Sequence, residues 1–172
     1  MPESDGKYKL LLFKKPIRIP VTSLRMGLFN ARSVRNKVEH IVEILNEFKL
    51  DVLCITETWL FETDTAVIQA ALPRTYTLLH VPRSTGSSGG GVAVICHKAV
   101  SNITLIPLDL MVSSFEVMEV AINLNSKITR VVVIYRPGHP GTDRNFMEEF
   151  NSFLETFTVK NGRLLICGDF NY

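Results

Sequence analysis

The sequence lacks the features that would place it in a specialised structural class. Its 172 residues include only three cysteines, Cys54, Cys96 and Cys167, which lie far apart within apolar runs. This spacing excludes a disulfide framework and a Cys-rich zinc site, and it is typical of buried thiols in a reducing compartment. No apolar run approaches the roughly 18–20 residues that a membrane span requires. We therefore expect an intracellular protein with no membrane partner.

A strong excess of one charge is also lacking. Lysine and arginine total 19 against 17 acidic residues, for a net charge of +2, which excludes a histone-like or polyanionic protein. The imbalance is local, because residues 1–25 hold six basic and two acidic side chains. Charge therefore permits a nucleic-acid partner, and only the N-terminal segment is basic enough to suggest one.

What the sequence does contain is the composition of one globular domain, with 46% hydrophobic and 21% charged residues. Residues 1–22 are charged and interrupted by prolines, and we interpret them as a lead-in to a domain over residues 23–172. An apolar run at 24–29 predicts a strand, and a buried strand is predicted at 51–56. Between them an amphipathic helix is predicted, with Ser33 as N-cap and apolar residues at Val34, Val38, Ile41, Val42, Leu45 and Phe48. This βαβ-like opening predicts two parallel strands.

The middle of the chain predicts a different arrangement. Five strands with short links are expected at 76–81, 91–96, 103–108, 117–124 and 128–134, which indicates an antiparallel or mixed section. Phenylalanines at helical spacing then predict a second helix that begins after Thr142 or Asp143, and a last buried strand is expected at 163–167. Together these elements predict a layered α/β sandwich with mixed β-sheets flanked by helices. Because the sequence stops just after this last strand, we expect an incomplete domain that lacks its C-terminal strands.

Polar side chains follow several of the predicted strands. Each has an ordinary interpretation alone, such as a turn former, a solvated edge residue or a helix cap. If the strands share one sheet system, however, these side chains converge at one end of it. A Glu and an Asp with two amides, and no Cys or His pair, suit a hard cation such as Mg²⁺ and metal-assisted hydrolysis of a phosphate ester. The residues are Asn30, Glu57, Tyr135, Asp169 and Asn171.

Several short blocks of sequence, in order, identify a family resemblance over residues 24–172. The chain resembles the endonuclease/exonuclease/phosphatase superfamily, and within it the endonuclease domain of non-LTR (LINE-type) retrotransposons. The blocks are Asn30–Lys37 (Asn-Ala-Arg-Ser-Val-Arg-Asn-Lys), Asp51–Trp59 (Asp-Val-Leu-Cys-Ile-Thr-Glu-Thr-Trp), Gly89–Ile95, Ile134–Pro137 and Gly168–Asn171. The Asn-Ala-Arg-Ser opening and the Thr58-Trp59 pair are closer to the retrotransposon branch than to repair nucleases.

The resemblance implies a role for each residue. Glu57 matches the metal-ligating glutamate, and Asn30 matches an asparagine that shapes the metal and phosphate site, so both are expected metal ligands. Asp169 matches the aspartate that orients or deprotonates the attacking water. Asn171 matches the asparagine that holds that site, and Tyr135 matches a tyrosine that hydrogen-bonds the phosphate. The implied cofactor is Mg²⁺, with Mn²⁺ as an alternative ion.

The implied function is Mg²⁺-dependent nicking of DNA in the nucleus, which provides a 3′-hydroxyl for a reverse transcriptase domain farther along a full-length protein. The family also uses a further aspartate and an Asp-His pair, which this sequence does not match. We therefore expect impaired activity from these 172 residues. His139, on a loop after Tyr135, is the one histidine placed to substitute, although a loop histidine needs no such role. Two alternatives stay open, a non-catalytic remnant of a retrotransposon insertion and a phosphatase or phosphodiesterase of the same superfamily.

Two further groups of residues have competing interpretations. Trp59 is expected to pack beneath the metal-site loop, although a base-stacking surface is the alternative. Four arginines either follow a phosphate track around the site or are ordinary solvated side chains. They are Arg74, Arg83, Arg136 and Arg144.

Overall fold

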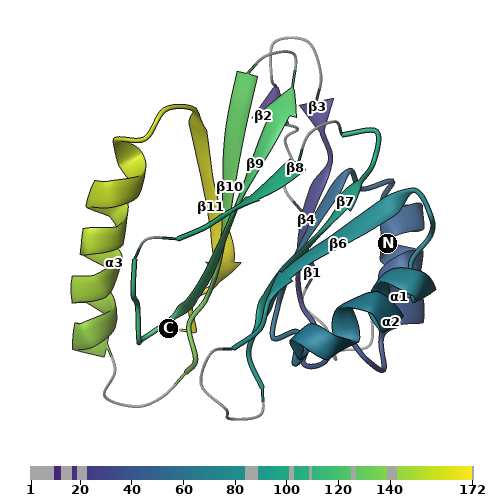
Figure 1. Cartoon of the computed structure of the whole chain (residues 1–172), viewed down its shortest axis with the longest axis horizontal. Helices are drawn as coiled ribbons and strands as arrows, with labels where there is room; N and C mark the ends of the chain where they lie inside the picture. The colour runs from purple at the N-terminus through teal and green to yellow at the C-terminus, as the bar shows by residue number, and fades with distance from the viewer. Residues whose placement is uncertain are drawn as a thin grey trace.

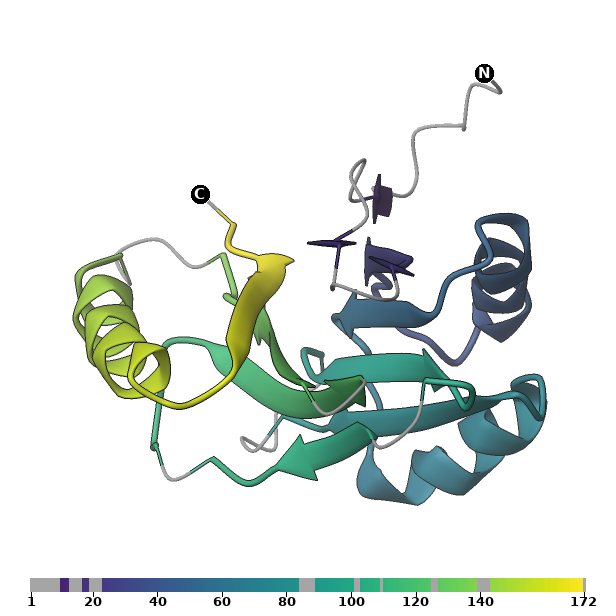
Figure 2. The same cartoon turned by 90° about the horizontal axis from the view of Figure 1, so that it is seen from above.

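The computed structural model describes residues 10–12, 17–18, 23–83, 89–100, 103–108, 110–124, 127–138 and 143–171. Two β-sheets pack face to face, and helices cover their outer faces, which gives four layers (Figure 1). Helices α1 (Val38–Glu47) and α2 (Thr65–Ala71) cover one sheet, and α3 (Asp143–Thr158) covers the other, on the opposite side of the molecule (Figure 2). A short 3₁₀ turn, η1 (Glu62–Asp64), precedes α2. The predicted layered α/β sandwich is confirmed.

The first sheet is mixed and has the order β1-β4-β5-β7-β6. Strands β4 and β5 run parallel with α1 between them, as the βαβ-like opening predicts, and the other pairs are antiparallel. Within the segment 1–22, residues 10–12 form β1, which extends this sheet beside β4. The strands are β1 (Leu10–Leu12), β4 (Met26–Asn30), β5 (Val52–Thr56), β6 (Tyr76–Val81) and β7 (Val92–His97); β2 (Ile17–Arg18) and β3 (Ser23–Leu24) form a separate short pair.

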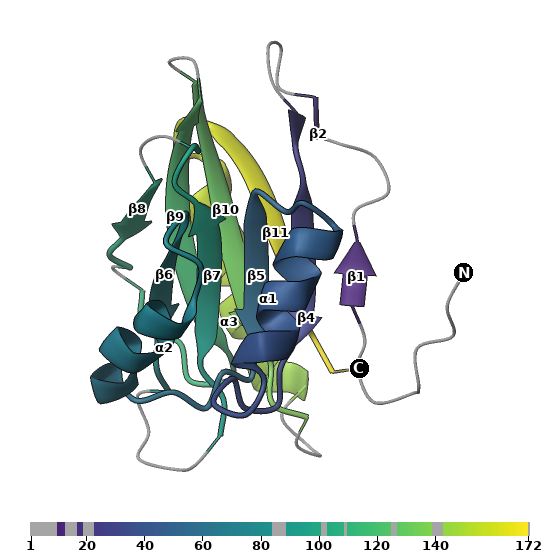
Figure 3. The same cartoon turned by 90° about the vertical axis from the view of Figure 1, so that its right-hand side faces the viewer.

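The second sheet is also mixed and has the order β11-β10-β9-β8. Its strands are β8 (Ile103–Ile106), β9 (Glu116–Leu124), β10 (Lys127–Tyr135) and β11 (Arg163–Asp169). Strands β10 and β11 run parallel, joined by α3, whereas the other neighbours are antiparallel. Strand β11 also contacts β4 and β5 across the sandwich, and Figure 3 shows β11 behind β4 and β5. Each sheet therefore contains one parallel pair of strands, and the carboxyl ends of the two pairs can lie close together across the sandwich.

The two sheets divide the core into three apolar layers. Successive side chains of β10 point alternately into two of these layers. Val131, Val133 and Tyr135 face the layer between the sheets, while Val132 and Ile134 face the phenylalanines of α3. The three cysteines are buried and free, as predicted. No helix in the described ranges has the length and apolar character of a membrane span.

The start of the first helix differs from the prediction. Ser33 is not its N-cap, because α1 begins at Val38. Instead, the amides of Ser33 and Val34 donate to the carbonyls of Glu57 and Thr58, both at 2.9 Å. Residues 31–34 thereby support the loop after β5.

Helix α2 was not predicted, since only Ile68 of its seven residues is buried and no apolar period is visible.

Gly168 lets β11 approach β10 closely. A Cβ at this position would collide with the carbonyl oxygen of Ile134 in the neighbouring strand. We therefore expect Gly168→Ala to destabilise the protein by about 1–3 kcal/mol, because backbone atoms must move apart. Gly138→Ala is the matched control, since its Cβ would meet nothing nearer than Asn171 Cβ at 3.4 Å. Chemical denaturation measures both, and equal stability of the two variants would contradict this packing.

Glu149 of α3 fixes the segment that leads into β9. It accepts hydrogen bonds from the amides and hydroxyls of Ser113 and Ser114, at 2.6–3.1 Å. Burial by itself would raise the pKa of Glu149, but these hydrogen bonds outweigh it and lower the pKa to about 2. A carboxylate whose pKa is lower in the folded state stabilises that state above its unfolded pKa, and the stabilisation is lost as pH falls toward the folded value.

We therefore expect the wild type to lose stability between about pH 5 and pH 2 more steeply than Glu149→Gln. The contribution at pH 7 is roughly 1–2 kcal/mol once solvent screening of this partly exposed group is included. Thermal melts across this pH range measure it. Glu148→Gln is the control, because Glu148 is exposed and pairs with Arg144 on the same helix face. If the melting temperatures of the wild type and of Glu149→Gln depended on pH in the same way, the stabilising hydrogen bonds to the Glu149 carboxylate would be contradicted.

Candidate functional site

The polar residues predicted from sequence lie at the carboxyl ends of the two parallel strand pairs. Asn30 is the last residue of β4 and Glu57 follows β5, while Tyr135 and Asp169 end β10 and β11. The register places Asn30 opposite Thr56 and Tyr135 opposite Asp169. The strand geometry thus brings one acidic residue from each sheet to the same end of the sandwich.

Asn30 joins these two acidic residues directly. Its Nδ2 donates to Glu57 Oε1 and to Asp169 Oδ2, both at 2.7 Å. Its Oδ1 accepts the amide of Arg32 at 3.2 Å, which fixes the orientation of the side chain. Two carboxylates this close repel unless a donor or a cation lies between them. Asn30 supplies that donor.

This donor set fits a divalent oxygen-binding cation. Glu57 and Asp169 present carboxylate oxygens, which are the ligands preferred by Mg²⁺, Mn²⁺ and Ca²⁺. Among the described residues no cluster of three or more His, Cys, Asp or Glu side chains could hold a metal ion, so water or substrate oxygens would complete the coordination. In this structure the Asn30 oxygen accepts from the Arg32 amide and its nitrogen donates to the carboxylates, and ligation of a metal by Asn30 stays a prediction.

Tyr135 lies beside this pair and is buried between the sheets. Burial, followed by the nearby charge of Glu57, raises the pKa of Tyr135 to about 12; Glu116 and Asp169 add to the increase and Arg83 opposes it. The phenol therefore keeps its proton at neutral pH. It is available as a hydrogen-bond donor to an anionic oxygen in the site.

Asn171 supports the site through its loop. Its amide donates to Asp169 Oδ1 at 3.3 Å, and its side-chain Nδ2 donates to the carbonyl of Arg136 at 2.7 Å. In this structure Asn171 therefore ties the end of β11 to the end of β10. Its side chain does not join the bridge that Asn30 forms between the two carboxylates.

Strained backbone is concentrated in the loops of the site. Among the described residues, six that are not glycine have positive φ, and five of them lie in these loops: Arg32 (42°), Ser33 (83°), Glu57 (53°), Trp59 (54°) and Asn171 (41°). Such conformations persist only where the surroundings impose them, and they are enriched at functional sites.

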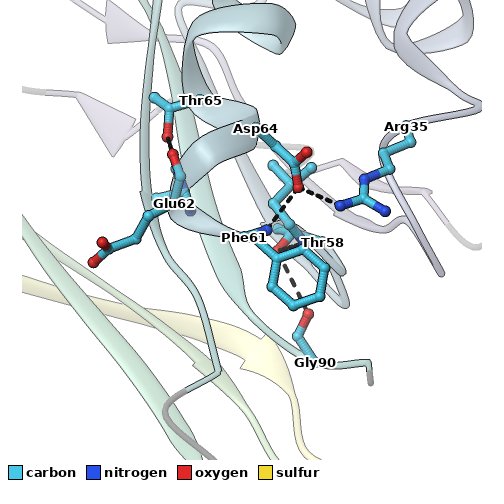
Figure 4. Close-up of polar contacts among 9 residues, drawn as sticks. Arg35, Thr58, Phe61, Glu62, Asp64, Thr65 and Gly90 are labelled. Atoms are coloured by element: carbon cyan, nitrogen blue, oxygen red, sulfur yellow. Dashed lines mark hydrogen bonds and ion pairs between the residues drawn. The ribbon is translucent and has the colours of Figure 1, made fainter. Parts of the chain in front are cut away.

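The loop after β5 is held from two sides. The amides of Thr58 and Trp59 donate to the carbonyls of Gly91 (3.1 Å) and Gly90 (2.8 Å). Farther along, Asp64 accepts from the amide of Phe61 and from the guanidinium of Arg35, and Thr58 Oγ1 lies 3.4 Å from the Gly90 carbonyl (Figure 4). These contacts hold the loop in the conformation in which Glu57 accepts the hydrogen bond from Asn30.

Sequence reasoning missed the ion pair between Arg83 and Glu116 beside Tyr135. Glu116 also accepts a hydrogen bond from the amide of Gly91. The ion pair therefore supports the segment Gly90–Gly91, whose carbonyls hold the loop after β5. The signal was available, because antiparallel pairing of β9 with β10 places Glu116 opposite Tyr135. Arg83 is therefore already partnered, which differs from a free arginine on a phosphate track.

Arg136 and Trp59 also differ from expectation. Arg136 is 2% exposed and neither lines a surface track nor is solvated; its Nη1 donates to the carbonyls of Phe170 and Asn171 (3.3 and 3.4 Å), and its guanidinium lies over the Phe146 ring at 4.7 Å. Trp59 does not pack beneath the loop, because its side chain is 43% exposed. Arg74 and Arg144 are exposed, and His139 lies outside the described residues.

Comparisons with known proteins agree with this fold. The Endonuclease/Exonuclease/phosphatase family matches residues 24–172. The RNA-directed DNA polymerase from mobile element jockey of Drosophila melanogaster is 25% identical over 149 residues, which are 87% of this chain but 15% of that protein. This similarity agrees with the resemblance to the retrotransposon branch.

Solved structures show the same fold. A humanised TDP2 from D. rerio aligns with a TM-score of 0.62 at 10% identity, over 86% of this chain and 66% of that chain. An AP endonuclease from Archaeoglobus fulgidus aligns with a TM-score of 0.61 at 19% identity, over 85% and 56%. The chain thus spans at most about two thirds of these structures. On the match over residues 24–172, the chain belongs to the endonuclease/exonuclease/phosphatase family, whose enzymes hydrolyse phosphate esters and generally depend on a divalent metal ion.

Proposed function

We propose that this chain forms part of a Mg²⁺-dependent DNA endonuclease of retrotransposon type, in which residues 23–172 are the domain and 1–22 its lead-in. The observation that carries the proposal is the pair of carboxylates, one from each sheet, that Asn30 joins at the strand ends. The similarity to a mobile-element polymerase supports DNA as the substrate class and a reverse transcriptase domain as the partner in a longer protein.

The carboxylates of Glu57 and Asp169 would hold the cation, with Mn²⁺ as an alternative to Mg²⁺. When bound, such a cation polarises a phosphoryl oxygen and favours attack by water. Asn30 keeps the two carboxylates at a fixed spacing. Asp169, which also accepts a hydrogen bond from the Asn171 amide, would orient a water molecule against the phosphate.

Tyr135 would act on the phosphate itself. Its phenol is protonated at neutral pH, as tyrosines ordinarily are, and burial raises its pKa further, to about 12; it would donate a hydrogen bond to an oxygen on which negative charge develops. A donor fixed in a buried position needs little reorganisation when that charge appears. The nuclear location of such an enzyme and the weak activity of these 172 residues stay predictions.

Nicking of supercoiled plasmid DNA tests the proposal. We expect little cleavage by these 172 residues and stronger cleavage by a longer chain, in both cases requiring Mg²⁺ and abolished by EDTA. We expect Glu57→Gln to reduce the rate of the longer chain at least about 100-fold, because one of the two charges that hold the cation is lost. Glu62→Gln is the matched control, since Glu62 is an exposed acid a few residues along the same loop. Its side chain points away from the Asp64–Arg35 pair (Figure 4).

The assay includes a longer chain that ends in the family's Asp-His pair, because the 172 residues do not match it. Activity gained only by the longer chain would support the proposal and explain weak cleavage by this one. Cleavage that is insensitive to EDTA or to Glu57→Gln, or no cleavage by either chain, would contradict it. A phosphate monoester assayed in parallel distinguishes a phosphatase from a nuclease.

A further inference from the structure

Trp59 lies on the same turn as Glu57, but Glu57 is hydrogen-bonded within the site whereas Trp59 is exposed to solvent. Glu57 joins the carboxylate bridge, Thr58 is buried, and the Trp59 side chain is 43% exposed. Positive φ at Glu57 and Trp59, with hydrogen bonds from the backbone to Gly90 and Gly91, fixes this turn. The turn therefore holds an indole ring at the surface in a defined position, although the core does not require it there.

The surroundings of the indole combine aromatic and cationic groups. A Cβ placed on Gly89 would lie 3.6 Å from Trp59 Nε1 and 3.8 Å from Arg83 Nη1, so the indole edge and the guanidinium are neighbours. The same glycine has a φ of +101°, which disfavours any larger residue over this edge. Because Arg83 is paired with Glu116, the surface offered to a ligand here is the exposed indole, and exposed aromatic rings are what proteins use to stack the bases of single nucleic-acid strands.

Phe61 provides a contrast within the same loop. It is more exposed, at 60%, but the Arg35 guanidinium already lies 5.2 Å from its ring centroid and is itself held by Asp64. Phe61 therefore has a structural partner. It also lies two residues farther than Trp59 from the carboxylate site.

The position of Trp59 relative to Glu57 suits a nucleotide substrate. Successive Cα atoms are about 3.8 Å apart, so the Cα atoms of residues 57 and 59 are separated by at most about 7.6 Å. Successive nucleotides of a DNA strand rise about 3.4 Å. A base within one or two nucleotides of a phosphate at Glu57 would therefore reach the indole.

We propose that Trp59 is a nucleobase-stacking residue, which binds a base of the DNA strand next to the phosphodiester held at the carboxylate pair. This inference rests on the proposed function and adds its substrate preference. Because a base inside a duplex has both faces covered, the bound base must be unpaired or rotated out of the helix. The site would thus favour single-stranded or distorted DNA at the position that contacts Trp59.

The sequence contains one tryptophan, so fluorescence excited beyond the absorption of its four tyrosines reports on Trp59 alone. The experiment titrates the protein, with Ca²⁺ in place of Mg²⁺ so that the carboxylate pair can keep a cation while cleavage is suppressed, with a single-stranded DNA oligonucleotide and with an abasic deoxyribose-phosphate oligomer of equal length. Stacking predicts strong quenching by the first and little by the second, since both carry the same charge. Equal quenching by the two, or no oligonucleotide binding at all, would overturn the inference.

Anisotropy of a labelled oligonucleotide measures the affinity of variants. We expect Trp59→Ala to weaken binding about 5- to 150-fold, the range found for base–aromatic stacking, whereas Trp59→Phe keeps most of the affinity because it retains a ring. Phe61→Ala is the matched control and should bind like wild type. Circular dichroism melts establish that the variants fold.

Unchanged affinity of Trp59→Ala would overturn the inference, as would an equal loss in Phe61→Ala. The plasmid assay is independent of these titrations, because Mg²⁺- and Glu57-dependent nicking can persist when stacking is absent. Failure of the stacking inference is therefore distinguishable from failure of the proposed nuclease function.

Discussion

The amide of Asn30 is the contact on which the arrangement of the site depends. It donates from β4 to Glu57 in its own sheet and to Asp169 in the other sheet, with both bonds at 2.7 Å. Two carboxylates at this spacing repel each other in the absence of a donor or cation, and the repulsion would separate the sheets at the end where they must meet. Asn30 offsets part of this repulsion by donating to both carboxylates. The same spacing leaves the pair ready to bind a cation.

The loops that present these residues are supported by the rest of the fold. Glu57, Trp59 and Asn171 have positive φ, a conformation that is unfavourable for residues with a side chain. The first two are held by the Gly90 and Gly91 carbonyls, and Asn171 is held by the buried guanidinium of Arg136. Most of the backbone strain in the described residues is therefore located at the site. We interpret this distribution as preorganisation for binding an anionic substrate.

The elements with strong apolar periods could be predicted from sequence, and the parts that depend on distant contacts could not. Strand β5, helix α3 and the parallel pairing of β4 with β5 follow from local patterns and from the βαβ rule. The five candidate residues could be named because each lies at or just after the end of a strand, within sequence blocks that resemble the family. The sequence could not predict that Asn30 turns its nitrogen to the carboxylates, that Arg136 is buried, or that Trp59 is exposed. These outcomes depend on contacts between segments that are far apart in the sequence, such as the bond between Asn30 and Asp169.

The central claim is that Glu57 and Asp169 form one divalent-cation site across the two sheets. Titration with Mn²⁺, followed by electron paramagnetic resonance, measures the number and affinity of sites without requiring catalysis. One site in the wild type is expected to weaken in both Glu57→Gln and Asp169→Asn, and the double variant is expected to lose less than the sum of the two single losses, because both residues act on the same ion. Independent, additive losses, or Mn²⁺ binding that survives either substitution unchanged, would contradict the account.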